Sequence, residues 1–185
     1  MESLRGQLLI ASPRLPDSNF ARTVVLLVEH HEQGALGVIL NRPTGVDIQS
    51  FWKDYLDGEV PSCEELLSVG GPCEGQIFCV HMDAGNSEGR VLENVYVSSG
   101  PDSILNIVNS ETAPFRVFIG YAGWGAGQLE SELEVGGWLT MKATTDHIFG
   151  ADLDTLWRKL LKQKGESVLR DVLNIRQIPE SAELN

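Results

Sequence analysis

Apolar residues crowd into the first quarter of the chain in a pattern that predicts three β-strands. The stretch 7–13 reads as a strand that ends at a proline, and 23–43 contains two strands around a turn at 32–34. Apolar residues occupy both faces of Val24–Val28, so we expect this strand to be covered on both sides. Gly34 is placed to supply the positive φ that a short hairpin with a bulge requires.

Apolar residues spaced three and four apart predict helices farther along the chain. One follows Asp47 and another follows Asp102, and each aspartate is expected to cap its helix. A short helix at 127–137 is expected to end at two glycines. Two separate helices are predicted near the end of the chain. The apolar stripes of the four longer helices are Ile48, Phe51, Trp52, Tyr55 and Leu56; Ile104, Leu105, Ile107 and Val108; Leu153, Leu156, Trp157, Leu160 and Leu161; and Val168, Leu169, Val172 and Leu173.

Strands are also predicted at 75–82, 93–99, 115–124 and 138–144, with a turn at 68–72. Strands and helices therefore interleave, but hairpins are present as well. This combination favours an α+β fold with a mixed or antiparallel sheet over a purely doubly wound one.

The length of 185 residues fits one domain with a sizeable core. Apolar residues continue to about position 178, so the predicted domain covers 1–178. The last segment, 179–185, is polar and is expected to be a mobile tail.

The charge of the chain argues against direct binding to duplex DNA. Fourteen Lys and Arg residues stand against 26 Asp and Glu, which gives a net charge of −12. The basic residues are dispersed apart from 157–164, which is more simply the solvated face of a helix. Nucleic-acid affinity depends on clustered cations that neutralise phosphates. The chain start lacks a secretory pattern and no apolar run could span a bilayer, so we expect a cytoplasmic protein without membrane association.

Three cysteines, Cys63, Cys73 and Cys79, form an odd set without C-x-x-C spacing. Reduced thiols fit this set better than a disulfide framework does. Cys79 and His81 would share a strand face, so a thiolate activated by histidine is one hypothesis. Small buried residues are the favoured interpretation, and a redox role stays open.

The stretch "GYAGWGAGQLESEL", residues 120–133, places several glycines around Trp124. A strand, a glycine turn and a helix could form a dinucleotide site, but the third glycine of G-x-G-x-x-G and the Lys-Ser/Thr of a P-loop are both missing. Glu130 falls in the first helical turn, where a bound phosphate would lie beside it. A like-charge pair at about 4 Å costs roughly 4 kcal/mol, so the phosphate interpretation is disfavoured.

A structural corner explains the same stretch better. Glycines let the backbone pass close to a buried Trp124, while Gln128 and Glu130 can bond loop amides. A recognition surface that includes Tyr121 and Trp124 is the second interpretation.

Two further groups could carry chemistry. Glu29 and His31 share one strand face and His30 lies on the other, and a Glu–His pair can transfer protons or hold a metal. Polar residues are nevertheless expected at a hairpin end, and one such pair does not predict a metal site. Asn41 and Arg42 end the next strand, where Arg42 can bind an anion or pair with a nearby carboxylate.

The stretches 6–43, 69–72 and 120–133 together resemble the signatures of the YqgE/AlgH family. The first reads L-L-I-A-x-P, then an acidic residue and Phe, an apolar strand ending in Glu-His, and Asn-Arg-Pro. The similarity spans nearly the whole chain. Cys73 stands where the family usually has an aliphatic residue.

The resemblance implies a single α+β domain whose bifurcated mixed sheet includes a small closed barrel surrounded by helices. It also implies a bacterial cytoplasmic protein. Members are commonly labelled transcriptional regulators, and no reaction is attached to the family.

We therefore expect a non-enzymatic regulatory or binding protein that affects transcription indirectly, through a protein or small-molecule partner. The alternative is an enzyme or small-ligand binder that uses a cleft beside the Gly-Trp-Gly loop. No cofactor and no metal are expected, and the oligomeric state is left open. The candidate ligand- or partner-binding residues are Glu29, His30, Asn41, Arg42, Tyr121, Trp124, Gln128 and Glu130.

Overall fold

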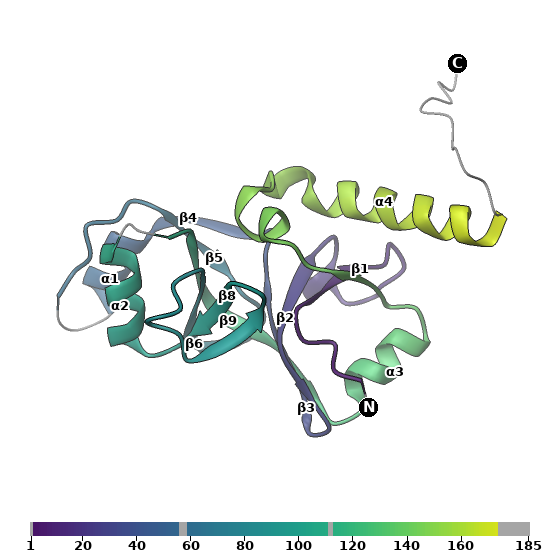
Figure 1. The fold of residues 1–185 in the computed structure, drawn as a ribbon, viewed down its shortest axis with the longest axis horizontal. Coiled ribbons are helices and arrows are strands. Elements are labelled where there is room, and N and C mark those ends of the chain that lie inside the picture. Colours follow the sequence, from purple (N-terminus) through teal and green to yellow (C-terminus); the bar gives the residue numbers. More distant parts are fainter. Residues whose placement is uncertain (1, 56–58, 111–112, 174–185) are drawn as a thin grey trace, which may run out of the picture.

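The computed structural model describes residues 2–55, 59–110 and 113–173 (Figure 1). They form an α+β fold in which one sheet of ten strands curls into a half-barrel with helices packed around it. The closed barrel implied by the family resemblance is thus present as a half-barrel. The expected tail at 179–185 lies outside the described residues. Among the helices described, none combines the length and hydrophobicity needed to cross a membrane.

One half of the sheet is built from three consecutive antiparallel strands and a late one. They are β1 (Gln7–Ala11), β2 (Val24–His31), β3 (Gly34–Ile39) and β10 (Trp138–Lys142). The expected hairpin joins β2 to β3, with a register shift near Val28 and a φ of +140° at Gly34. Any Cβ at Gly34 would collide with the backbone oxygen of Trp124, so glycine is required there.

Alternate residues of β1 and β2 enter two different cores, which confirms that both faces are covered. Leu8, Leu26 and Val28 pack in one core with Leu156 and Leu160 of helix α4. The intervening residues of both strands pack in the other core. A helix or a second sheet layer on each side explains why these strands carry so few polar residues.

The sheet divides along the long strand β9 (Phe115–Gly125). One end of β9 pairs with β3 and the other with β6 (Cys73–His81), while β5 (Leu66–Val69) adds parallel pairing near its middle. Strands β4 (Pro43–Asp47), β7 (Gly89–Leu92) and β8 (Val95–Ser98) complete the second half of the sheet. The mixed, bifurcated sheet inferred from the resemblance is therefore observed.

The prediction of a turn over 68–72 is partly wrong. Residues 66–69 form β5, whose Leu67 and Ser68 are buried, and the chain turns only after Val69. The short segment becomes a strand because β4 and β9 supply hydrogen-bonding edges on its two sides. A segment of four residues directly before two glycines is too short to reveal this by itself.

Two helices cover the β4–β8 half of the sheet. Helix α1 (Ile48–Tyr55) begins as predicted, since the Asp47 carboxylate accepts from the Ser50 amide at 2.7 Å. Helix α2 (Pro101–Ser110) begins one residue before Asp102, which corrects the predicted cap. Proline is favoured at the first helical position, so Asp102 lies within the first turn instead.

Two other helices flank the β1–β3 half (Figure 1). Helix α3 (Gln128–Glu134) is short and is followed by Gly136 with φ of +73°, as expected for a glycine-terminated helix.

Helix α4 (Leu153–Leu173) is one continuous helix, so the prediction of two separate helices is wrong. Only Gly165 interrupts the helical pattern, and a glycine inside a helix costs about 1 kcal/mol, which is too little to end it. A short π-helix, η2 (Asp146–Gly150), precedes α4.

Candidate functional site

The turn from β9 into α3 is a corner built around Trp124. The Trp124 side chain is only 6% exposed, as the sequence predicted. Its ring stacks on Phe20 with a centroid separation of 6.0 Å and meets Trp138 edge-on at 6.0 Å. Phe20 ends the short 3-10 helix η1 (Ser18–Phe20), so the corner packs against the segment that follows β1.

Glu132 is the polar centre of this corner. The indole N–H groups of Trp124 and Trp138 both donate to its Oε2 atom, at 3.0 and 2.8 Å. The Gln128 amide donates to Oε1 at 3.0 Å, one helical turn earlier. Three neutral donors therefore hold one carboxylate, and both buried indoles have the partner that a buried N–H requires. The sequence reasoning did not single out Glu132, although its i, i+4 spacing from Gln128 was a usable signal.

Gln128 also bonds a loop amide, as predicted, because its Oε1 accepts from Gly125 N at 3.1 Å. The glycines around Trp124 differ in backbone conformation. Gly120 and Gly127 have φ of +70° and +73°, whereas Gly125 lies in the strand and is not among the positive-φ residues. Gly120 therefore distorts β9 four residues before Trp124, and the chain turns into α3 only at Gly127.

A cleft of about 520 Å³ opens beside this corner. We call it the corner cleft. Its walls are the loop residues Ser12, Arg14, Leu15, Pro16, Asp17 and Phe20, together with Gly123, Trp124, Gln128, Glu132, Val135, Gly136 and Gly137. Of the eight sequence candidates, the corner cleft therefore includes only Trp124 and Gln128.

His30 and Glu130 form a second polar contact behind the corner. Their Nε2 and Oε1 atoms are 2.9 Å apart, and His30 is only 8% exposed. The Leu4 amide donates to His30 Nδ1 at 2.9 Å, so Nε2 carries the hydrogen that Glu130 accepts. Bonds from the backbone N–H of Glu130 and from the His30 ring hold the pKa of the Glu130 carboxyl below its usual value.

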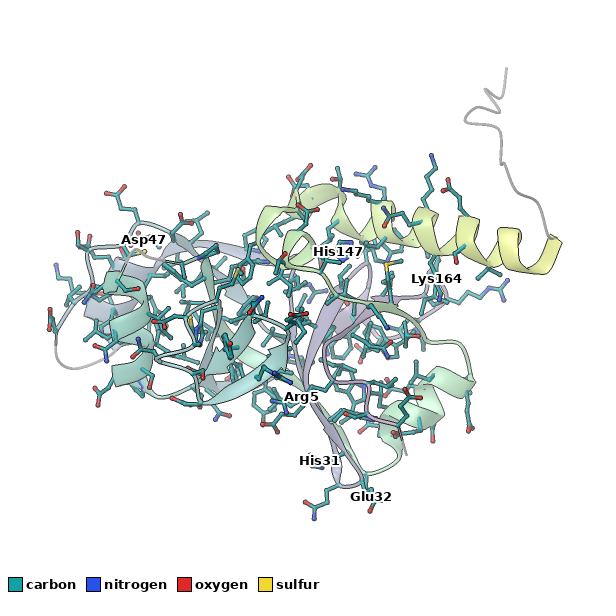
Figure 2. The ribbon with its side chains drawn as sticks, in the orientation of Figure 1. Arg5, His31, Glu32, Asp47, His147 and Lys164 are labelled. Atoms are coloured by element: carbon teal, nitrogen blue, oxygen red, sulfur yellow. The ribbon has the colours of Figure 1, made fainter. Side chains whose placement is uncertain are left out.

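Glu130 thus differs from its predicted role in part, since its carboxylate reaches across to His30 while Gln128 bonds the loop amide. Glu29 and His31 lie on the exposed side of β2. His31 and Glu32 lie at the tip of the β2–β3 hairpin (Figure 2). The Glu–His contact of this protein therefore joins His30 to a residue 100 positions away, not to its neighbour Glu29.

The other candidates have structural surroundings. Asn41 clamps the start of β2, because its Oδ1 accepts from Val24 N at 2.8 Å and its Nδ2 donates to Arg22 O at 2.9 Å. Tyr121 packs edge-on against Phe78, in the core that also contains Leu156 and Leu160 of α4. Arg42 is half-buried and makes no ion pair with any described residue.

The buried histidine–serine pair on β6 and β8 does not form a nucleophile and base. His81 Nε2 lies 3.1 Å from Ser98 Oγ, and that hydroxyl donates to Asn86 O at 2.7 Å. The serine hydrogen therefore points away from His81, which must donate to the serine. Burial lowers the pKa of His81 and raises the pKa of the Cys79 thiol, so both groups are neutral at pH 7. Cys63, Cys73 and Cys79 form no disulfide with one another.

A larger cavity, of about 970 Å³, lies between β9, β5 and η2 and includes Arg116. We call it the Arg116 cavity. The guanidinium donates to the backbone oxygens of Leu40 and Ile148 at 2.6 and 3.1 Å, and to Ser68 Oγ at 3.1 Å. The sequence reasoning missed Arg116 because it lies inside an apolar strand with no motif around it. Within the described ranges, no three His, Cys, Asp or Glu side chains gather as a metal-binding group.

Comparison with known proteins places this fold. The model of the AlgH-like family matches residues 8–169. The chain belongs to the AlgH-like family. It is 36% identical to a UPF0301 protein of Chlorobium limicola over 94% of this chain and 93% of that one. A UPF0301 protein of Streptomyces coelicolor is 34% identical over 100% of this chain and 97% of its own length.

Solved structures agree. The AlgH-like fold of this chain is similar to the solution structure of the AlgH protein from Pseudomonas aeruginosa, with a TM-score of 0.71 and 32% identity over 97% and 96% of the two chains. A crystal structure of a Corynebacterium diphtheriae protein, 24% identical with a TM-score of 0.67 over 88% and 87%, shares the fold.

In this AlgH-like chain, two of the three signature stretches meet at the corner cleft. Residues 12–20 come from the first stretch and residues 123–128 from the third. The second stretch packs farther along the same strand, where Gly70 N donates to Ile119 O at 2.8 Å. The segments that carry the resemblance therefore gather around the centre and the α3 end of β9, and the third segment includes that end of the strand.

Proposed function

We propose that this AlgH-like chain is a regulatory protein that binds a small polar ligand in the corner cleft and catalyses no reaction. The observation that carries the proposal is Glu132, a carboxylate fixed on the cleft wall by two indoles and an amide. The volume of about 520 Å³ falls in the range of small-molecule sites, roughly 300–1,000 Å³.

The lining suits binding better than acid–base catalysis. A cleft of aromatic and aliphatic walls with a few fixed polar groups orients a ligand. Glu132 already accepts three hydrogen bonds, and a carboxylate offers about four acceptor positions. One position therefore remains for a donor group of the ligand, such as an amine or a hydroxyl. Phe20 and Leu15 provide apolar surface for the rest of the molecule.

Any effect on transcription would then be indirect. The net charge of −12 opposes binding to DNA phosphates, and the cleft walls carry Asp17 and Glu132 against one arginine, Arg14. We place the protein in the cytoplasm, where the occupancy of the cleft would report the level of a metabolite to a protein partner.

A thermal-shift screen of metabolites and nucleotides tests the proposal. A ligand present at about 100 times its Kd should add roughly 2.7 kcal/mol of stability. Binding should weaken in Glu132→Gln, which keeps the shape of the side chain but removes its charge. Glu134→Gln is the matched control, because Glu134 is exposed on the same helix outside the cleft.

Two results would overturn the proposal. One is a hit that binds equally well to Glu132→Gln and to the control variant. The other is turnover of a bound compound by the wild-type protein with loss of that turnover in Glu132→Gln, which would make the cleft an enzyme site.

A further inference from the structure

Arg116 is a half-buried cation for which the described residues provide no anion. All three of its recorded hydrogen bonds go to neutral acceptors, two backbone oxygens and the Ser68 hydroxyl. The guanidinium carbon lies 5.1 Å from the centre of the Phe118 ring, so an aromatic face covers one side of the group. No carboxylate of the described residues lies within 4.0 Å of it.

Such an arrangement is unusual energetically. Removing a cation from water is costly unless a counter-charge accompanies it, and buried charges are therefore normally paired. Burial lowers the pKa of Arg116 to about 10, which still leaves the group charged at neutral pH. Five N–H donors are available on a guanidinium, so the three recorded bonds leave donor capacity unused.

The surroundings of Arg116 are apolar as well as polar. Ile48 and Val108 from the first two helices, and Ile148 and Phe149 from η2, line the same cavity. Glu64 and Glu65 also line it, but both are exposed and so lie at its mouth. Arg116 is the only Lys or Arg among the described lining residues.

We propose that the Arg116 cavity is a second binding site, which takes an organic monocarboxylate with an apolar body. The carboxylate would accept from Arg116 and the Ser68 hydroxyl, and the apolar body would lie against Leu66, Phe115 and Phe149, which keep accessible surface in the cavity. A single cation matches a single negative charge, whereas a phosphate dianion would need further donors. The site is separate from the corner cleft, because no residue lines both.

Calorimetric titration of the full chain with four probes tests this assignment. Octanoate supplies both the charge and the apolar body, acetate only the charge, octylammonium the body with the opposite charge, and inorganic phosphate a different anion. We expect octanoate to bind roughly tenfold or more tightly than each of the other three. Backbone NMR shifts on octanoate addition should centre on Val108 and Ile148, and not on Trp124.

Variants decide which residue is responsible. Arg116→Gln should weaken octanoate binding roughly tenfold or more. Arg90→Gln should have no effect, because Arg90 is exposed on β7 outside the cavity. Arg116→Gln also leaves two buried backbone oxygens without their donor and can fail to fold.

Leu66 supplies an independent test, since it lines the cavity and is 52% exposed. Leu66→Lys should tighten octanoate binding and Leu66→Glu should weaken it.

The assignment is wrong if octylammonium binds as tightly as octanoate, or if the two Leu66 variants bind octanoate equally. It is also wrong if the NMR shifts centre on the corner cleft. Arg116 would then be a structural strut that ties β9 to Leu40, Ser68 and Ile148. A preference for phosphate over octanoate would likewise contradict the proposed ligand class.

Discussion

The imidazole of His30 donates from Nε2 to the Glu130 carboxylate at 2.9 Å, and thereby ties the end of β2 to helix α3. The other ring nitrogen accepts from the Leu4 amide, and Ser3 Oγ donates to the His30 backbone oxygen at 2.9 Å. One ring orientation therefore joins three parts of the chain: the first residues, the hairpin and the helix that follows the Trp124 corner.

This relationship predicts that Glu130 fixes the start of the chain. In Glu130→Ala the His30 ring loses the acceptor that sets its orientation, so the amide hydrogen of Leu4 should exchange with solvent faster. The loss of one hydrogen bond should lower the free energy of unfolding by about 0.5–1.5 kcal/mol. Hydrogen exchange followed by NMR measures both effects. Glu134→Ala is the control, and equal Leu4 exchange rates in the two variants would contradict the prediction.

Trp124 should be a large contributor to stability. Its ring is 6% exposed and contacts Phe20 and Trp138, so Trp124→Ala should lower the free energy of unfolding by roughly 3–5 kcal/mol. Denaturation with urea measures this change. If Trp124→Ala keeps near-normal stability but loses a ligand or partner, the residue serves recognition and the architectural interpretation is wrong.

The glycines of the corner should differ in their tolerance of a side chain. At Gly120 the φ of +70° is strained for other residues, and a Cβ would lie 2.6 Å from the Cys73 backbone oxygen. Gly120→Ala should therefore cost roughly 1–3 kcal/mol or more. At Gly125 a Cβ would meet only Gln128 Oε1, at 3.9 Å, and φ is not positive. Gly125→Ala should be nearly neutral, and equal unfolding midpoints for the two variants would contradict this reading of the corner.

Stability should fall as pH drops below about 6.5, partly because of His81. Burial lowers the pKa of His81 in the folded protein, and this effect exceeds the opposing influence of Asp83 and Glu88. Above the ordinary histidine pKa both states are neutral and His81 contributes nothing to the pH dependence. Below it the unfolded chain takes up the proton first, so unfolding becomes easier as pH falls towards the folded-state pKa.

Urea denaturation at pH 7.5 and at pH 5.5 measures this dependence. His81→Asn should reduce the difference between the two pH values, although His147, whose pKa burial also lowers, will retain part of it. His31→Gln, at the exposed hairpin tip, serves as the control. A pH dependence that is unchanged in His81→Asn would exclude His81 as a source.

Duplex DNA should not bind appreciably at about 150 mM salt. The chain has 26 acidic and 14 basic residues, so its net negative charge repels phosphates. Basic residues cluster only at 157–164, along α4. Fluorescence anisotropy with labelled duplexes measures the affinity. Binding that weakens steeply with added salt would show phosphate contacts and would contradict the proposed indirect mode of action.

Local chemistry was readable from the sequence. The Asp47 cap needs only Ser50, three residues away, and the φ of Gly34 follows from the length of its hairpin. Apolar residues at successive positions of β2 correctly predicted that both of its faces are buried. In each case the interacting groups lie close in sequence, or the composition of one strand records its environment.

The contacts of the candidate functional residues could be found only from the tertiary structure. Strand alternation placed Glu29 and His31 on one face and His30 on the other, but only the fold brings His30 to Glu130. Arg116 becomes notable only because Leu40, Ser68 and Ile148 surround it from other elements. The sequence suggested two helices where the structure has the single helix α4. Gly165 inside it costs about 1 kcal/mol, which is too little to divide the helix.

The amino-acid sequence by itself determined which segments form most of the strands and helices, which strand faces are buried, and the strongly acidic character of the chain. Only the tertiary structure decided which polar groups meet, where the cavities lie, and that 66–69 joins the sheet. The physical reason is that hydrophobic periodicity acts within a segment, whereas hydrogen-bond partners and strand edges come from residues tens of positions away. Their contacts are fixed by the packing of whole elements, which no local pattern records.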